Sequence, residues 1–260
     1  MLIVALLLVA TGCSRPAPPT PATPGPTGPL PAATETMLSG WQLTLPVAGQ
    51  NGGASIVRPA AVSPPWLTTD GSGNLVFWAP VNGVTTPNSE HARTELDRID
   101  GFAAGSGGQR LAASVAVSQL PTEVPEVIVG QIHGAGDISS VPFVMIFYSN
   151  GAVKAVVKQE TSGDAHSDLP LLPQVPLGAP FDYSISDDGD GSLTVTATYE
   201  GRTATADAPV PAAFAGASVR FQAGAYQQAA SAPGTAAPDD GARVIFSAIT
   251  VGPGAASPTP

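Results

Sequence analysis

The sequence predicts an all-β protein, a β-sandwich or jelly roll, from three observations. Short apolar runs of strand length recur along the chain and are separated by turn signals. No stretch keeps a helical period for more than a few turns, and Pro interrupts most helix candidates. The 260-residue chain holds 29 Gly and 28 Pro but only 12% charged residues. This composition favours turns and strands over helices.

The N-terminal residues 1–13 predict an export signal that ends at the single cysteine of the chain. Met1–Gly12 is apolar, is short for a bilayer span, and ends in small residues directly before Cys13. The tetrapeptide Ala10-Thr11-Gly12-Cys13 resembles a bacterial lipobox, in which the cysteine is lipidated and becomes the new N-terminus. We therefore expect an exported bacterial lipoprotein, associated with the cell envelope or extracellular, with a membrane anchor at Cys13. Plain secretion with an unmodified cysteine is the alternative.

The rest of the chain divides by composition into a linker, one domain and a tail. Residues 14–36 are rich in Pro and Thr, which predicts an extended, semi-rigid spacer. The folded domain is expected over residues 37–252, and a disordered tail over residues 253–260. Within the domain, Ala229–Gly241 predicts a mobile loop.

Strand candidates follow one another through the domain. The first is Trp41–Leu45, which we expect Pro46 to stop. Two hairpins are predicted, one across Ser149-Asn150-Gly151 and one across Asp187–Gly191. The acidic cluster Asp187–Gly191 lacks the spacing and the terminal Glu of a calcium-binding loop, so a hairpin turn explains it better. The other candidates are Asn74–Pro80, His91–Ile99, Gly108–Leu120, Glu126–His133, Pro142–Tyr148, Ala152–Lys158, Phe181–Ser186, Ser192–Tyr199, Thr203–Ala206, Val219–Gln228 and Arg243–Val251.

Charge and cysteine content exclude several classes of function. The formal net charge is −10, from 10 Lys and Arg against 20 Asp and Glu. This balance argues against a nucleic-acid partner, which needs cations to displace phosphate counterions. A polyanionic substrate would require the few cations to be focused in one cleft. A single cysteine excludes internal disulfides and cysteine-rich zinc sites.

Three predicted strands place polar side chains at a spacing of two residues, on one face of each strand. In Val219–Gln228 this face carries polar groups, and Gly224 there suggests that a ligand approaches the backbone closely. Taken singly, each polar residue has an ordinary structural explanation, such as a solvated ion pair. The residues on these faces are Arg93, Glu95 and Asp97 in the first strand, Gln131 and His133 in the second, and Gln222, Gly224, Tyr226 and Gln228 in the third.

Together the three strands resemble the alginate lyase domain of polysaccharide lyase family seven. That family is marked by the motifs R-(S/T)-E-(L/V)-R, Q-(I/V)-H and Y-F-K-A-G-x-Y-x-Q. The chain has R-T-E-L-D over 93–97, Q-I-H over 131–133 and R-F-Q-A-G-A-Y-Q-Q over 220–228, in family order, and W-Q-L-T-L-P over 41–46 is similar to the family's first strand. The resemblance implies a jelly-roll β-sandwich with a concave substrate groove. It also implies a polyuronate substrate and a reaction without metal or organic cofactor.

The resemblance also implies roles for the matching residues. A uronate lyase removes the C5 proton and expels the 4-linked oxygen, so it must neutralise the neighbouring carboxylate. Arg93 and Gln131 match the neutralising positions, and Tyr226 matches the proton-handling tyrosine. His133 is expected either as the base or as a third donor to the carboxylate. Glu95, Asp97, Gln222 and Gln228 are expected to bind substrate.

The chain departs from the family pattern at two groove positions. Asp97 replaces the second arginine of the first motif, and Gln222 replaces the lysine of the third. Arg98 comes one residue too late and is expected on the opposite face. We expect a monomeric lyase acting on alginate, with guluronate-containing blocks among its substrates, given the Q-I-H form of the middle motif. Two alternatives remain: a lyase for a less charged uronate glycan such as glucuronan, and a carbohydrate-binding module without turnover.

Overall fold

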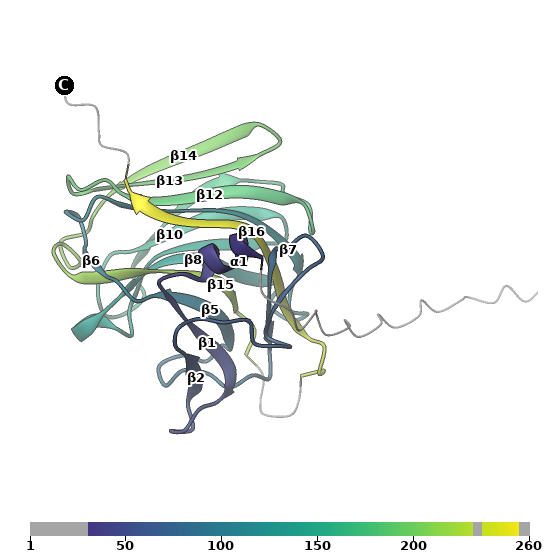
Figure 1. Cartoon of the computed structure of the whole chain (residues 1–260). Helices are drawn as coiled ribbons and strands as arrows, with labels where there is room; N and C mark the ends of the chain where they lie inside the picture. The colour runs from purple at the N-terminus through teal and green to yellow at the C-terminus, as the bar shows by residue number, and fades with distance from the viewer. Residues whose placement is uncertain (1–30, 231–235, 255–260) are drawn as a thin grey trace, which may run out of the picture.

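The computed structural model describes residues 31–230 and 236–254, which form two facing β-sheets (Figure 1). The elements, in chain order, are α1 (Ala32–Leu38), β1 (Trp41–Ala48), β2 (Ala54–Val57), β3 (Leu67–Thr69), β4 (Leu75–Pro80), β5 (Arg93–Arg98), β6 (Phe102–Ala103), β7 (Gln109–Gln119), β8 (Glu126–Gly134), the 3-10 helix η1 (Gly136–Ile138), β9 (Pro142–Ser149), β10 (Ala152–Lys158), β11 (His166–Leu172), β12 (Pro180–Asp187), β13 (Ser192–Tyr199), β14 (Arg202–Pro209), β15 (Ser218–Gln227) and β16 (Gly241–Pro253).

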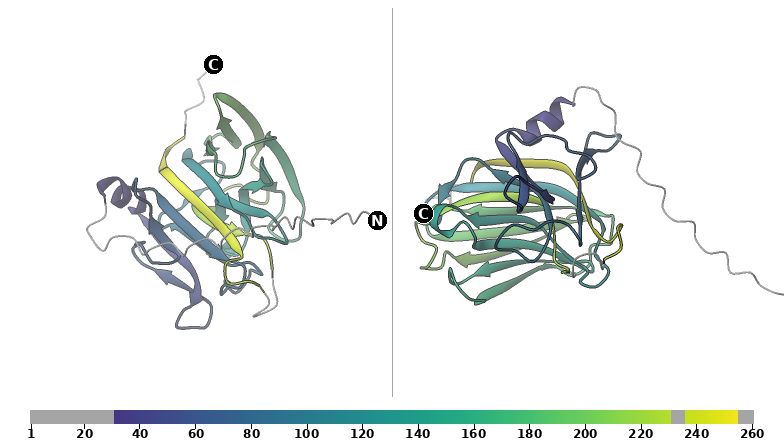
Figure 2. Two further views of the ribbon diagram at one scale, coloured as in Figure 1. Left: turned by 90° about the vertical axis from the view of Figure 1, so that its right-hand side faces the viewer. Right: turned by 90° about the horizontal axis from the view of Figure 1, so that it is seen from below.

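The two sheets are antiparallel throughout and interleave distant parts of the chain. The first sheet has nine strands in the order β11-β10-β9-β8-β15-β5-β1-β2, with β6 beside β15. The second has seven in the order β14-β13-β12-β7-β16-β4-β3. Two further views show the sheets as the two layers of a sandwich, with α1 at its outside (Figure 2). The predicted all-β jelly-roll sandwich is confirmed. The three motif strands β8, β15 and β5 are neighbours in the middle of the first sheet.

Alternating apolar residues from both sheets fill the space between them. Along β7, the buried residues Leu111, Ala113, Val115 and Val117 alternate with more exposed neighbours. The rings of Tyr148 in β9 and Phe181 in β12 stack across the two sheets with centroids 6.0 Å apart. Because side chains alternate along a strand, the neighbours of these core residues point to the outer face of their sheet.

Two hydrogen bonds tie the motif strands to the opposite sheet. The hydroxyl of Thr94 in β5 donates to the carbonyl oxygen of Trp78 in β4 at 2.6 Å. The hydroxyl of Tyr183 in β12 donates to the carbonyl oxygen of Val129 in β8 at 2.9 Å. A Cβ atom at Gly130 would collide with the Tyr183 ring, so only glycine fits there. These bonds fix which face of β5 and β8 is turned to the core, and therefore which face is turned to the groove.

The N-terminal boundary of the domain lies earlier than predicted. Residues 32–36 were expected in the spacer, but they begin the helix α1. Met37 and Leu38 join the core, and the Thr34 hydroxyl donates to the carbonyl oxygen of Gly73 at 2.9 Å. The helix is held by these tertiary contacts, because seven residues are too few for an independently stable helix.

Two other boundaries also differ from the expectation. Strand β1 runs through Pro46 to Ala48, and the pairing of β1 with β2 shifts between Leu45 and Ala48. An irregularity of this kind accommodates a proline, which cannot donate to a sheet ladder. At the other end, β16 continues to Pro253, which pairs with Gln109. The predicted strands are otherwise confirmed, whereas β2, β3, β6 and β11 were not predicted.

Several sequence predictions fall outside the described residues. These are the export signal, the lipid anchor at Cys13 and most of the spacer and tail, together with residues 231–235 of the predicted mobile loop. Over 31–230 and 236–254 no helix has the length and apolar character needed to cross a membrane.

Candidate active site

The register of the three central strands brings the motif residues together in rows. Tyr226 of β15 pairs with Arg93 of β5. Gln222 lies between Asp97 of β5 and Gln131 of β8, its partners on either side. Three segments that are distant in the sequence therefore meet on the face of the sheet that is turned away from the core.

A buried ion pair stands at the centre of this surface. Nη1 of Arg93 donates to Oε2 of Glu95 at 3.0 Å, and Nε2 of Gln131 donates to Oε1 of Glu95 at 2.6 Å. Burial raises the pKa of the Glu95 carboxyl, against the opposing pull of Arg93 and the Gln131 hydrogen bond. Glu95 is 1% exposed and both of its oxygens accept bonds from protein groups. In this geometry Glu95 does not face the groove as expected of a substrate contact, and it orients Arg93 and Gln131 instead.

Gln131 is itself fully buried, and its amide orientation is fixed by its neighbours. Its Nε2 also donates to Oε1 of Gln222 at 3.0 Å, and Nε2 of Gln222 donates to Oδ1 of Asp97 at 2.8 Å. A carboxylate can only accept, so Glu95 and Asp97 set the direction of this chain from both ends. The two N–H groups of Gln131 thus bond to Glu95 and Gln222. No N–H group of Gln131 is left to donate to a substrate carboxylate, as the sequence had led us to expect.

The phenol of Tyr226 is held from two sides. The guanidinium carbon of Arg93 lies 3.5 Å from the centre of its ring, in cation–π contact. The Tyr226 hydroxyl is 2.8 Å from Oγ of Ser89, which also donates to the carbonyl oxygen of His91 at 2.9 Å. Ser89 was missed in the sequence because it lies in the loop before β5, outside any motif.

His133 is buried beside the groove as a neutral imidazole. Burial, with smaller contributions from the positive charges of Arg93 and Arg220, lowers the pKa of His133 to about 4. Nδ1 of His133 lies 3.1 Å from the carbonyl oxygen of Gly134. Because a carbonyl can only accept, this bond places the proton on Nδ1 and leaves Nε2 as an acceptor. The geometry therefore favours the base over the donor among the two expected roles of His133.

Asp97 is almost fully enclosed by donors. Its Oδ2 accepts from Nε2 of Gln42 at 2.8 Å, and its Oδ1 accepts from Gln222 and forms an ion pair with Nε of Arg220 at 2.7 Å. Asp97 is 4% exposed. Asp97 and Gln222 were predicted to bind substrate, but Asp97 has no free oxygen, and both ends of the Gln222 amide are engaged with protein. Asp97 therefore positions the groove residues Gln42, Gln222 and Arg220.

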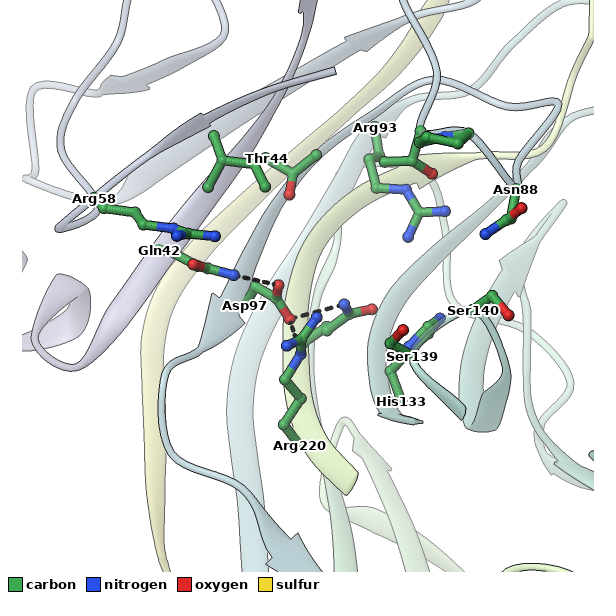
Figure 3. Close-up of a pocket in the computed structure, with 14 residues that line it drawn as sticks. Gln42, Thr44, Arg58, Asn88, Arg93, Asp97, His133, Ser139, Ser140 and Arg220 are labelled. Carbon is green, nitrogen blue, oxygen red and sulfur yellow. Dashed lines mark hydrogen bonds and ion pairs between the residues drawn. The ribbon is translucent and has the colours of Figure 1, made fainter. Parts of the chain in front are cut away.

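A pocket of about 260 Å³ opens above this network (Figure 3). Three arginines line it: Arg58, Arg93 and Arg220. Of these, only Arg93 was predicted from the sequence to lie in the groove. With Asp97 as the one lining carboxylate, the pocket has an excess of positive charge in a protein of net charge −10. The lining residues are Gln42, Thr44, Ile56, Arg58, Thr86, Pro87, Asn88, Arg93, Asp97, His133, Ser139, Ser140, Arg220 and Gln222.

Two further expectations, about Arg98 in β5 and Gly224 in β15, have different outcomes. Arg98 lies off the groove face as predicted, bonded to the Ser39 carbonyl at 3.1 Å and to Asp100 at 3.2 Å. Gly224 is not a place of ligand approach: a Cβ there would collide with the backbone of Thr94 and Glu95 in the adjacent strand.

The predicted substrate contact at Gln228 is not brought into the pocket. The pairing of β15 with β8 shifts between Ala223 and Tyr226, which changes the alternation beyond that point. The Gln228 amide donates to the carbonyl of Tyr226 at 3.1 Å, and Gln227 is buried instead. Within residues 31–230 and 236–254, no group of three or more His, Cys, Asp or Glu side chains could hold a metal ion.

Comparisons with known proteins identify the family of this chain. The family model described as alginate lyase matches residues 36–253. The alginate lyase from Pseudomonas aeruginosa is 27% identical with a TM-score of 0.70, over 83% of this chain and 99% of that one. The alginate lyase A1-II', a member of polysaccharide lyase family seven, is 26% identical with a TM-score of 0.69, over 84% and 96%.

The alginate lyase from Klebsiella pneumoniae has the same fold, with 23% identity and a TM-score of 0.72 over 86% of this chain and 99% of that one. No match was found among curated protein sequences. The family model covers the whole sandwich and all three motif strands. The chain therefore belongs to the alginate lyases of polysaccharide lyase family seven.

Proposed function

We propose that this polysaccharide lyase cleaves alginate by β-elimination, with His133 as the base, Tyr226 as the acid and Arg93 as the group that neutralises the carboxylate. The observation that carries the proposal is that Arg93 and His133 line one pocket with Arg58 and Arg220, and that the Arg93 guanidinium also lies over the Tyr226 ring. Family membership establishes a lyase acting on alginate, and the residue roles rest on the geometry of this chain.

Proton removal from C5 places a second negative charge next to an ionised carboxylate, so the enzyme must supply preorganised positive charge there. Arg93 lines the pocket and uses one N–H on Glu95, which leaves other guanidinium donors for a uronate carboxylate. Its place is fixed by Glu95 on one side and the Tyr226 ring on the other. No reorganisation of Arg93 is then needed when charge develops.

The proton transfers follow from the hydrogen-bond partners. Neutral His133 offers Nε2 as an acceptor for the C5 proton. The electrons of the C5–H bond form the C4–C5 double bond, and the bond from C4 to the bridging oxygen breaks. The Tyr226 hydroxyl gives its proton to that oxygen, while Ser89 holds the phenol in place.

The test of this function is a panel of polyuronates followed by ultraviolet absorbance of the new double bond. We expect alginate to be cleaved and glucuronan to be cleaved more slowly or not at all. Cleavage of glucuronan with no action on alginate would reject the proposal. The binding-module alternative predicts no absorbance on any polymer.

We further propose a preference for guluronate-containing blocks. The support is the Q-I-H form of the middle motif and the likeness to A1-II', a variant of which was solved with a product named GGG. That structure is 26% identical to this chain with a TM-score of 0.67. Initial rates on purified guluronate and mannuronate blocks test this preference. Equal rates on both would remove it.

For localisation we propose a lipid anchor at Cys13 that tethers the lyase to the cell envelope. The support is the apolar run Met1–Gly12 that ends at this cysteine. Cys13→Ser should move the protein from the membrane fraction to the soluble fraction without changing its specific activity. Unchanged membrane association of the variant would contradict the anchor.

A further inference from the structure

We propose that Arg220 is a substrate-binding residue of this lyase, held by Asp97 so that its guanidinium takes a uronate carboxylate next to the one at Arg93. The inference rests on the proposed function and names how the groove replaces the two cations that the motifs lack. Arg220 precedes the position of the missing lysine by two residues, on the same face of β15.

The first observation is the pairing around Arg220. It lies opposite His133 in the β15–β8 ladder, and its Nε is 2.7 Å from Oδ1 of Asp97. Both Arg220 and His133 line the same pocket. A carboxylate bound at Arg220 would therefore belong to a sugar close to the one whose proton His133 takes.

The second observation is the way the guanidinium is used. The ion pair with Asp97 is formed at Nε, and the Arg220 side chain is partly exposed, so the outer edge with Nη1 and Nη2 can make the bidentate contact that arginine forms with a carboxylate. The Arg220 side chain is 26% exposed whereas that of Asp97 is 6% exposed. Asp97 is thus shielded from solvent, whereas the Arg220 guanidinium is accessible to a ligand.

The third observation is the enclosure of Asp97. Its two oxygens accept from the amides of Gln42 in β1 and Gln222 in β15, on either side of β5, and Oδ1 also forms the ion pair with Arg220. Both oxygens of Asp97 are thus engaged by protein groups, and the residue is only 4% exposed, which leaves little surface for a sugar hydroxyl. It can fix the angle of Arg220, which makes Asp97 a positioning residue rather than a substrate contact.

Arg58 extends the same surface. It lines this pocket and also an adjoining pocket of about 740 Å³ along the β1–β2 hairpin, together with Ile56, Thr86 and Pro87. Figure 3 shows Arg58 and Arg220 on the two sides of Gln42 and Asp97. The pockets therefore form a continuous surface on which several uronates can bind.

The experiment measures binding in a Tyr226→Phe background, in which substrate should be consumed about 10²-fold more slowly. The probes are an alginate tetrasaccharide and the same tetrasaccharide with its carboxyl groups reduced to alcohols, titrated calorimetrically at low and at high salt. Arg220→Gln should weaken binding of the charged probe by at least about tenfold, and less so at high salt. Binding of the reduced probe should stay unchanged. Arg110→Gln, which removes an exposed arginine from β7 in the other sheet, is the matched control and should bind like its parent.

Asp97 loses its ion pair in Arg220→Gln, so stability needs its own check. The double variant Asp97→Asn/Arg220→Gln removes both charges of the pair and should regain thermal stability but not affinity. In the active enzyme, Arg220→Gln should raise KM on alginate with little change in kcat. Parent-like affinity of Arg220→Gln for the charged probe would overturn the proposal, as would an equal loss on both probes. If the wild-type enzyme left alginate uncut, the proposed function would fail instead, and the two binding titrations would still decide on Arg220.

Discussion

The guanidinium of Arg93 is shared between Tyr226 and Glu95: its carbon lies 3.5 Å from the centre of the Tyr226 ring, and its Nη1 lies 3.0 Å from a Glu95 oxygen. One residue thus joins the phenol of Tyr226, the proposed acid, to the buried Glu95 carboxylate. Arg93 is itself 8% exposed, so this arrangement exists before substrate arrives. Such preorganisation is what stabilisation of a developing charge requires.

Removal of the Tyr226 hydroxyl tests the proposed role of Tyr226 as the general acid. Tyr226→Phe keeps the ring over which Arg93 lies and loses only the bond to Ser89. We expect kcat on alginate to fall by about 10²-fold or more, as is typical for loss of a general acid or base, with an unchanged melting temperature. A variant that retains most of its turnover would exclude Tyr226 as the acid.

Glu95→Gln tests the buried ion pair. The substitution leaves Arg93 buried without its carboxylate, a change that typically costs about 3–5 kcal/mol of unfolding free energy. Activity should fall as well, because Arg93 loses the partner that orients it. Denaturant unfolding measures the first effect, with Glu90→Gln in the exposed preceding loop as the control. Equal stability of the two variants would contradict the anchoring role of Glu95.

The pH dependence of kcat/KM tests the proposed role of His133 as the general base. The pKa of His133 is lowered from 6.5 to about 4, so its imidazole takes up a proton only near and below this pH. A base must be unprotonated, and activity should therefore persist through mildly acidic pH and decline as pH falls through about 4. A decline centred near the ordinary value of 6.5 would show that His133 is not buried as a neutral base.

Restoring the family residues with Asp97→Arg/Gln222→Lys should damage the site rather than improve it. Arg at position 97 would face Arg220 and the amide donors of Gln42, which now bond to the Asp97 carboxylate. Leaving such buried donors unpaired costs about 1–3 kcal/mol each. We expect a lower melting temperature and a higher KM on alginate. A stable variant with a lower KM would indicate that the groove is only a weakened form of the family pattern.

Much of the fold could be predicted because the strands carry local signals. Alternation, turns and the absent helical period located the central strands β5, β8 and β15, and the motif order placed Arg93, Gln131, His133 and Tyr226. The helix α1 carried no such signal: its residues are held by contacts with Gly73 and with the core, which are distant in the sequence.

The parts of the site that were missed depend on pairing between strands. Asp97 looks like a lost cation when its strand is read alone, and only the register with β15 shows that Arg220 stands beside it. The place of Gln228 was wrong because the shift in the β15–β8 ladder cannot be read from alternation. Ser89 and Arg58 lie in segments without a motif, and their roles come from three-dimensional proximity to Tyr226 and to the pocket.

The most direct test of the central claim is the chemistry of the product from alginate. Wild-type protein and Tyr226→Phe are incubated side by side with alginate, ultraviolet absorbance is followed, and the oligosaccharides are weighed by mass spectrometry. We predict that the wild type produces absorbing oligosaccharides, each lighter by one water than the corresponding hydrolysis product, and that Tyr226→Phe produces about 10²-fold less in the same time. Non-absorbing products of hydrolytic mass, or no products from the wild type, would contradict a β-eliminating alginate lyase.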